Sequence, residues 1–306
     1  MKSVYWGAIY LSLAASIWGG MYVASKYVLD IVPPFTLVFF RYLLAGVILV
    51  WICRAKKVSL MEIKDKGLIL QIGFIGYFLS IAAQFIGTKL SSAHMGAVIT
   101  TLSPIFQSGF AILLLKEKLS FKQFLSILIS FIGVLVIIGL SPGVSEDSSF
   151  TGNLFLLAAA LFWGYYSVLA KKASENYSAL QITTWAVLIA TAITFPVAIS
   201  ESKLWNFTDL FDWTVLVGIF YVAILATAVA FFCWNKGLSL VPSHQAGLFF
   251  FFQPIVGSVL GWFILGEELT RSFYIGSILI LGGVYYNMVT NKDVDEVNIK
   301  GFHVEK

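Results

Sequence analysis

Charged residues are scarce in this chain, and their scarcity excludes most classes of protein. They make up 12% of the 306 residues, whereas hydrophobic residues make up 59% and the mean hydropathy is +0.88. A soluble domain carries about 25% charged residues, so this composition indicates an integral membrane protein. The apolar runs are also unbroken, whereas the strands of a transmembrane barrel alternate in polarity, so the spans are predicted to be helices.

Long polar connections are lacking as well. A helix needs about 20 apolar residues to cross a bilayer. The apolar runs predict ten spans, at residues 5–28, 33–53, 67–88, 92–115, 122–140, 150–172, 178–199, 212–234, 244–266 and 271–291. These spans use most of the chain, which leaves no room for a soluble catalytic domain.

The groups that catalysis at depth would need are missing too. The two cysteines, Cys53 and Cys233, form neither a disulfide framework nor a metal-binding spacing. No Asp or Glu lies in the interior of a predicted span, so neither paired carboxylates nor a nucleophile with its base is available there. We therefore predict no catalytic residue, no metal and no cofactor. A passive pore is the other alternative to a carrier, although no ring of like groups or filter is present.

The 20 Lys and Arg residues are spread over the loops rather than gathered in a patch, so no nucleic-acid partner is predicted. If the N-terminus is cytoplasmic, the outer side holds only Lys89, Lys203 and Arg271, and only Lys26 and Arg41 fall within spans. The excess of basic residues on the other side then places both ends of the chain in the cytoplasm.

The chain repeats itself at a nearly constant offset. Shifted by 150 residues, scarce residue types coincide: His94 with His244, Pro104 with Pro254, and Glu117 with Glu267. At an offset of 145, Trp18-Gly19 coincides with Trp163-Gly164. The predicted units are a first repeat at residues 1–140, a linker loop at 141–149, a second repeat at 150–291 and a loose, polar cytoplasmic tail at 292–306.

Each repeat holds five predicted spans, and this odd number means that the second copy crosses the membrane from the opposite side. The predicted fold class is therefore an all-α integral membrane protein, whose ten transmembrane helices form two inverted five-helix repeats. Such repeats place a substrate site near the middle of the bilayer, between the two halves.

The candidate substrate-binding residues lie at or near that depth: Trp18, Tyr22, Arg41, Tyr77, Gln84, Thr101, Trp163, Tyr166 and Gln253. Aromatic walls with a few amide and hydroxyl groups suit a neutral, zwitterionic or aromatic small molecule. For Arg41, a structural role with bonds to backbone carbonyls is the alternative. Pro104 and Pro254 each free a backbone carbonyl inside a span and are the candidate hinges.

Histidines are the candidates for coupling transport to protons, because the spans hold no interior acid. His94 and His244 each stand at the start of a span, where capping or packing is the alternative role. Glu117, at the end of its span, is predicted to be a solvated surface charge or a cap for the following helix. These positions favour a facilitative or weakly coupled carrier.

The motifs resemble those of EamA-type transporters of the drug/metabolite transporter (DMT) superfamily. The resemblance is carried by Trp-Gly in spans 1 and 6, by residues 39–46 (Phe-Phe-Arg-Tyr-Leu-Leu-Ala-Gly), and by the two Pro-to-Glu blocks at 104–117 and 254–267. It covers about residues 5–290. It implies a ten-helix carrier of a bacterial cytoplasmic membrane that exports an amino acid-like, purine-like or drug-like metabolite by alternating access, as a monomer or homodimer.

Overall fold

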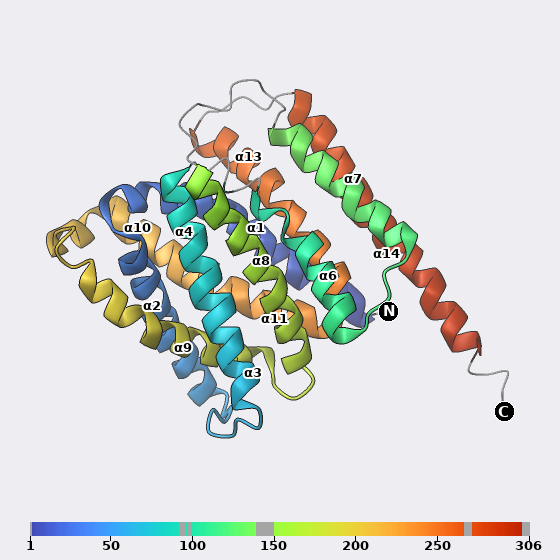
Figure 1. Cartoon of the computed structure of the whole chain (residues 1–306), viewed down its shortest axis with the longest axis horizontal. Coiled ribbons are helices and arrows are strands. Elements are labelled where there is room, and N and C mark those ends of the chain that lie inside the picture. The colour runs from blue at the N-terminus through green and yellow to red at the C-terminus, as the bar shows by residue number, and fades with distance from the viewer. Residues whose placement is uncertain (1, 92–95, 97–98, 139–149, 266–270, 302–306) are drawn as a thin grey trace.

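The computed structural model describes residues 2–91, 96, 99–138, 150–265 and 271–301, and every regular element in this part of the chain is a helix (Figure 1). The predicted all-α class is confirmed. The elements are α1 (Lys2–Ile31), α2 (Pro34–Ala55), α3 (Lys66–Gln71), η1 (Ile72–Leu79), α4 (Ser80–Leu90), α6 (Ser103–Leu115), α7 (Phe121–Ile138), α8 (Phe150–Ala173), α9 (Ala179–Ser200), η2 (Phe207–Phe211), α10 (Trp213–Phe220), η3 (Tyr221–Val229), α11 (Ala230–Leu240), α12 (Ser243–Leu248), η4 (Phe249–Phe251), α13 (Phe252–Leu265) and α14 (Arg271–Gly301).

Within the described residues, five helical runs are long and apolar enough to cross a membrane: Pro34–Ala55, Lys66–Leu90, Phe150–Ala173, Ala179–Ser200 and Trp213–Leu240. The chain is a multi-pass membrane protein, and every predicted span overlaps a described helix, while the count of ten spans stays a prediction. The sequence-based end of the last span at residue 291 stays a prediction. Helix α14 continues to Gly301, through most of the segment that was expected to be a loose tail.

Helix α2 begins at a proline pair. Pro33 is its N-cap, and Pro34 stands in its first turn, where a missing N–H costs least. The backbone N–H groups of Phe35 and Thr36 donate to the carboxylate of Glu201, at 3.3 and 2.7 Å. Because Glu201 directly follows α9, this bond ties the start of α2 to a helix of the other half.

Two helical runs carry a π-helical segment at equivalent places. The segments η1 and η3 overlap when the first is shifted by 150 residues. A π-helical turn changes the i→i−4 pairing and is frequent at functional sites. In η1, the carbonyl of Tyr77 accepts a hydrogen bond from the Tyr42 hydroxyl at 2.6 Å. The backbone thus repeats the duplication that the sequence predicts.

Two other runs are interrupted near a proline. Helix α6 begins at Ser103 after a turn, with Pro104 in its first turn. Helix α12 passes through the 3₁₀ turn η4 into α13, with Pro254 in the first turn of α13. Both prolines are buried. Irregular backbone at membrane depth is tolerated where it is enclosed by protein or lines a cavity, and the two interruptions flank such a cavity.

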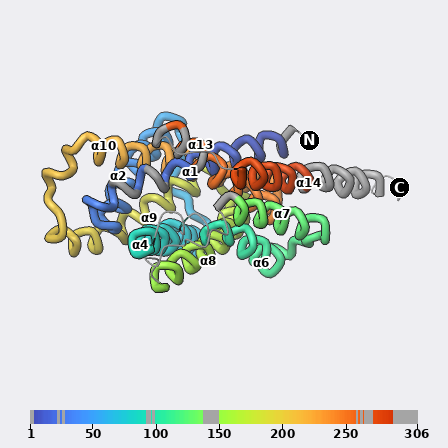
Figure 2. Tube along the Cα trace, turned by 90° about the horizontal axis from the view of Figure 1, so that it is seen from above, coloured from blue at the N-terminus to red at the C-terminus, as the bar shows by residue number. Residues whose placement is uncertain are grey.

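The two halves are interleaved. The most extensive contacts between helices join one half to the other: α4 with α8, α1 with α11, α2 with α9, and α7 with α14. The last pair lies side by side at one flank of the bundle in both views (Figures 1 and 2). Small residues permit close approach in such bundles; a Cβ atom at Gly164 of α8 would lie 2.7 Å from the backbone nitrogen of Gln107 in α6.

Candidate functional site: the central cavity

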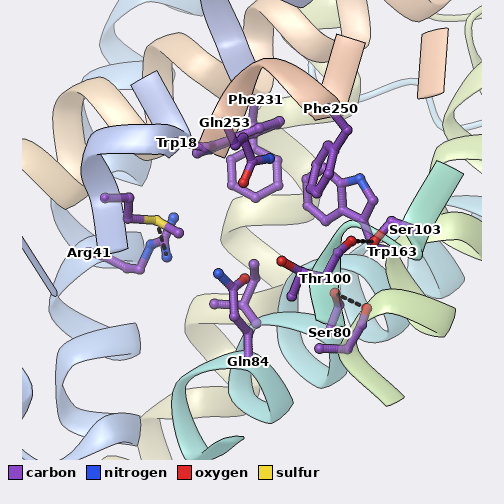
Figure 3. Close-up of a pocket in the computed structure, with 13 residues that line it drawn as sticks. Trp18, Arg41, Ser80, Gln84, Thr100, Ser103, Trp163, Phe231, Phe250 and Gln253 are labelled. Atoms are coloured by element: carbon purple, nitrogen blue, oxygen red, sulfur yellow. Dashed lines mark hydrogen bonds between the residues drawn. The ribbon is translucent and has the colours of Figure 1, made fainter. Parts of the chain in front are cut away.

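A cavity lies where helices of the two halves meet (Figure 3). Its free volume, about 20 Å³, holds about one water molecule. We call it the central cavity, and in this conformation it is too small for a metabolite. Its walls are formed by Trp18, Met21, Arg41, Ser80, Ile81, Gln84, Thr100, Ser103, Ala159, Trp163, Phe231, Phe250 and Gln253.

The two tryptophans of the Trp-Gly repeat meet in this cavity. The rings of Trp18 and Trp163 pack edge to face, with centroids 5.0 Å apart and planes at 88°. Their N–H groups differ. The Nε1 of Trp18 donates to the carbonyl of Ala226 at 2.8 Å, whereas the buried Nε1 of Trp163 has no partner in the described structure.

Arg41 is fully buried in the cavity wall. Its Nε donates to the Thr227 hydroxyl at 2.8 Å, and its Nη2 donates to the Ala226 carbonyl at 3.4 Å. Its Nη1 has only the sulfur of Met21, at 3.8 Å. Among the described residues, no carboxylate forms an ion pair with this guanidinium. The guanidinium carbon also lies 5.3 and 5.4 Å from the ring centroids of Tyr42 and Phe85. Part of the structural alternative is thus present, but no described group carries a negative charge to balance that of Arg41.

The amide of Gln253 completes this set of donors. Its side chain is 4% exposed, and its Nε2 has no hydrogen-bond partner in the described part of the chain. The hydroxyls nearby are occupied: Ser80 donates to the carbonyl of Ala159 at 3.0 Å, and Ser103 donates to that of Thr100 at 2.6 Å. Among the fully buried side-chain atoms of the cavity wall, those without a partner in the described structure are thus the N–H donors of Trp163 and Gln253.

Five of the predicted binding residues line the cavity, namely Trp18, Arg41, Gln84, Trp163 and Gln253. Sequence reasoning missed the other eight: Met21, Ser80, Ile81, Thr100, Ser103, Ala159, Phe231 and Phe250. A signal for several of them was available. At the offset of 150 residues, three pairs of lining residues are equivalent: Ile81 with Phe231, Thr100 with Phe250, and Ser103 with Gln253.

Two predicted binding residues, Tyr77 and Tyr166, lie beside the cavity instead, in a cluster that we call the tyrosine–asparagine network. It consists of Tyr42, Tyr77, Tyr166, Thr183 and Asn235. The Tyr166 hydroxyl donates to Oδ1 of Asn235 at 2.9 Å. The Nδ2 of Asn235 donates to the hydroxyls of Tyr77 and Thr183, at 3.1 and 2.9 Å. The hydroxyls of Tyr77 and Tyr166 are thus engaged by protein groups rather than directed at a ligand.

The remaining candidates lie elsewhere or are not described. Thr101 is buried next to Thr100 but does not line the cavity. The side chain of Tyr22 lies outside the described part of the structure. Pro104 packs against Gly247, whose Cβ would lie 3.2 Å from the Pro104 Cα. The hinge roles of Pro104 and Pro254 stay predictions.

A separate polar cluster, formed by Glu117, Ser243 and His244, joins the two halves at the end of α6. The Nδ1 of His244 lies 2.6 Å from Oε2 of Glu117, and the backbone N–H groups of Ser243 and His244 donate to the same carboxylate at 2.9 and 3.2 Å. The side chain of Glu117 is 16% exposed. The predicted solvated charge, or cap of the following helix, is therefore wrong: Glu117 caps α12, in the other half.

The environment of Glu117 also sets its acidity. Burial raises the pKa of the carboxyl, but the hydrogen bonds from His244 and from the backbone of Ser243 outweigh it, so the net pKa lies below the ordinary value of 4.5. His244 thus takes part in a capping contact, which agrees with capping as the alternative to a role in proton coupling. Its sequence equivalent His94 lies outside the described residues. In the described part of the chain no cluster of His, Cys, Asp or Glu could hold a metal.

Interleaved halves with a shared, buried cavity at interrupted helices define a multi-pass membrane transporter. The chain belongs to the EamA-like transporter family, which matches residues 5–139 and 150–289. The two matched segments correspond to the two repeats, and the resemblance to EamA-type transporters of the DMT superfamily is confirmed.

Relatives that span nearly the whole chain carry transporter names. The uncharacterized transporter YetK of Bacillus subtilis is 27% identical over 294 residues, which cover 94% of this chain and 88% of that protein. A probable amino-acid metabolite efflux pump of Salmonella typhimurium is 26% identical over 285 residues, 90% and 92% of the two chains. A crystal structure at 18% identity aligns with a TM-score of 0.78 over 94% of this chain and 98% of that one, which shows the shared fold.

Proposed function

We propose that this protein is a carrier that exports a small metabolite, amino acid-like, purine-like or drug-like, by alternating access through the central cavity. The observation that supports this most directly is that both halves of the chain contribute residues to the cavity wall. Trp18, Arg41 and Gln84 come from the first half, and Trp163 and Gln253 from the second. A rigid movement of one half against the other would open the cavity to one side at a time.

The small size of the cavity supports a carrier over a passive pore. A pore needs a continuous wet path, whereas about 20 Å³ of free volume admits about one water molecule. Binding of a metabolite therefore requires the halves to separate. The contact of Glu117 with α12 joins the halves at one end of the bundle, and in this proposal it breaks when the cavity opens to that side.

The placement of the protein in the cell is part of the same proposal. The basic residues of the loops favour a bacterial cytoplasmic membrane with both termini on the cytoplasmic side, which puts Glu117 at the cytoplasmic end of the carrier. Transport is proposed to be facilitative, because no predicted span has an acid in its interior. The named relative from Salmonella typhimurium is consistent with efflux of amino-acid metabolites.

Counterflow in proteoliposomes tests the proposal. Purified protein is reconstituted, and exchange of labelled amino acids and purines is measured with and without an imposed proton gradient. We expect saturable exchange that ignores the gradient and falls strongly in Trp163→Ala. Non-saturable flux would identify a pore. Accumulation driven by the gradient would overturn the facilitative mechanism and return attention to His94 and His244.

A further inference from the structure

We propose that the central cavity selects organic carboxylates. The carboxylate is held by the guanidinium of Arg41 together with the free N–H groups of Trp163 and Gln253, and the apolar remainder packs against the aromatic walls. The inference deepens the proposed function, because it takes the central cavity to be the substrate site. It assigns a chemical class that the transporter family alone does not supply.

The first step is the charge of Arg41. An arginine buried at membrane depth is costly unless an anion, a cavity water or carbonyl groups compensate it. Arg41 has one good oxygen partner, Thr227, and one long one, the carbonyl of Ala226. Its Nη1 meets only sulfur, although a guanidinium fork matches the two oxygens of a carboxylate.

The second step is the pair of donors without partners. Buried N–H groups are nearly always hydrogen-bonded in folded proteins, so each exception needs an explanation. Trp163 and Gln253 both leave an N–H unpaired in the cavity wall, at 5% and 4% exposure. Figure 3 shows Arg41, Gln253 and Trp163 arranged around the same space. A ligand that offers acceptors and a negative charge supplies what these side chains of the cavity wall lack.

The third step is the absence of competing acids. None of the cavity-lining residues is Asp or Glu, so a positively charged ligand would meet Arg41 without compensation. The start of α6 adds to the same polarity, because Ser103, its first residue, lines the cavity and the N-terminal end of a helix carries partial positive charge. The cavity therefore favours anions over amines.

The fourth step is the shape of the remaining wall. Three ring systems of the wall pack against one another: the centroid of the Trp18 ring lies 5.4 Å from that of Phe231 and 6.0 Å from that of Phe250. Rings of this kind bind a flat or branched apolar group. Together with the donors, they favour an organic carboxylate over inorganic phosphate.

The test is ligand-dependent stabilisation of the purified protein in detergent. The probes are phenylacetate, its neutral isostere phenylacetamide, the cation phenethylamine, and inorganic phosphate. A ligand that binds only the folded state raises the unfolding midpoint with a saturable concentration dependence. We expect phenylacetate to do so, and the other three probes to bind at least about tenfold more weakly. Phenylacetamide loses the charge-assisted bond, phenethylamine carries the same sign of charge as Arg41, and phosphate lacks the apolar group.

Variants separate the anion site from general packing. Arg41→Gln should weaken phenylacetate binding about tenfold or more, and Arg41→Lys, which keeps the charge but not the fork, should lie between. Trp163→Phe keeps a ring but removes the free N–H, and should reduce the preference for phenylacetate over phenylacetamide. Trp205→Phe is its matched control, since it removes another buried indole N–H without a partner in the described structure, at a residue that does not line the cavity, and the preference should persist.

The outcomes also separate this inference from the proposed function. Equal binding of phenethylamine and phenylacetate, or no shift with any probe, would overturn the carboxylate site. A preference that survives in both Arg41 variants would overturn it as well. Carboxylate-selective binding in detergent without counterflow of any labelled compound would uphold the site and overturn the carrier. Counterflow of a cation that does not depend on Arg41 would do the reverse.

Discussion

Two buried polar clusters lie against each other in the bundle, and they differ in how completely their groups are paired. In the tyrosine–asparagine network every hydroxyl and both ends of the Asn235 amide are hydrogen-bonded within the protein. In the central cavity, N–H groups of Trp163 and Gln253 have no partner in the described structure. The two clusters touch, since the rings of Trp163 and Tyr166 are 5.0 Å apart.

This difference in hydrogen-bond pairing distinguishes structural residues from ligand-binding residues better than residue type does. Tyrosine, tryptophan and amide side chains at the same depth look alike in the sequence. A network whose members satisfy one another rigidifies the bundle, whereas an unsatisfied buried group is a cost that a ligand removes. The comparison predicts opposite responses to substitution in the two clusters.

The largest effect on stability is expected from Asn235→Leu. Asn235 is 1% exposed and joins Tyr77, Tyr166 and Thr183. Its loss leaves the buried hydroxyls of Tyr77 and Tyr166 with only their long mutual contact of 3.4 Å, which should lower the free energy of unfolding by about 2–4 kcal/mol. Thermal unfolding in detergent, followed by aromatic circular dichroism, measures this.

Thr183→Val is the matched control for Asn235→Leu. It removes a single acceptor of the network, and should cost about 1 kcal/mol. Equal midpoints for Asn235→Leu and the wild-type protein would show that the network does not hold the helices together.

The next effect concerns pH, at the cluster that joins α6 to α12. A folded-state pKa below the ordinary 4.5 means that the ionised Glu117 stabilises the protein above that pH. This contribution is lost as the pH falls below 4.5 and through the folded-state pKa. We expect Glu117→Gln to lower the stability by about 1 kcal/mol near pH 7, because charge-assisted bonds to α12 are weakened.

Unfolding midpoints measured across the acidic range check this sign. The wild-type protein and Glu117→Gln should converge below pH 4.5, since protonation removes the charge that the substitution removes. Glu62→Gln serves as a control, because Glu62 is exposed. A constant difference between wild type and Glu117→Gln at every pH would contradict the assignment of the pH dependence to this carboxylate.

A smaller loss is expected from Tyr166→Phe. The substitution keeps the ring that packs on Trp163 but removes the O–H that donates to Asn235. The expected cost is about 1 kcal/mol. Because the Tyr166 hydroxyl is held in the network, substrate affinity in the counterflow assay should stay close to that of wild type. A loss of affinity with unchanged stability would instead support the predicted binding role of Tyr166.

Much of the fold could be predicted because apolar length and duplication are properties of the linear sequence. The helix class, the equivalence of Pro104 with Pro254, and the choice of Trp18 and Trp163 as cavity residues all follow from spacing. Spacing does not show in which direction around the helix axis each side chain points. Tyr77 and Gln84 lie in one run, yet Gln84 lines the cavity and the Tyr77 hydroxyl belongs to the network. Tyr77 stands in a π-helical segment that the sequence does not reveal.

The contacts between the halves could not be predicted from the sequence either. Glu117 and His244 each end or begin a span, and nothing in their spacing shows that they meet. Phe231 and Phe250 resemble any other phenylalanine of the chain until their repeat equivalents, Ile81 and Thr100, are also found at the cavity. The duplication predicts further cavity residues only when the equivalent position in the other half is considered for every candidate residue.

The smallest effect on stability, and the sharpest contrast with Asn235, is expected from Gln253→Leu. Both side chains are buried amides, but Nε2 of Gln253 has no partner in the described structure. Replacing an unsatisfied buried amide by an apolar group of similar size should change the free energy of unfolding by less than about 0.5 kcal/mol, or raise it. The same substitution should weaken binding of phenylacetate several-fold, because one donor is lost. A destabilisation as large as that of Asn235→Leu would mean that Gln253 is a structural amide, and the donors of the cavity would then be reduced to Arg41 and Trp163.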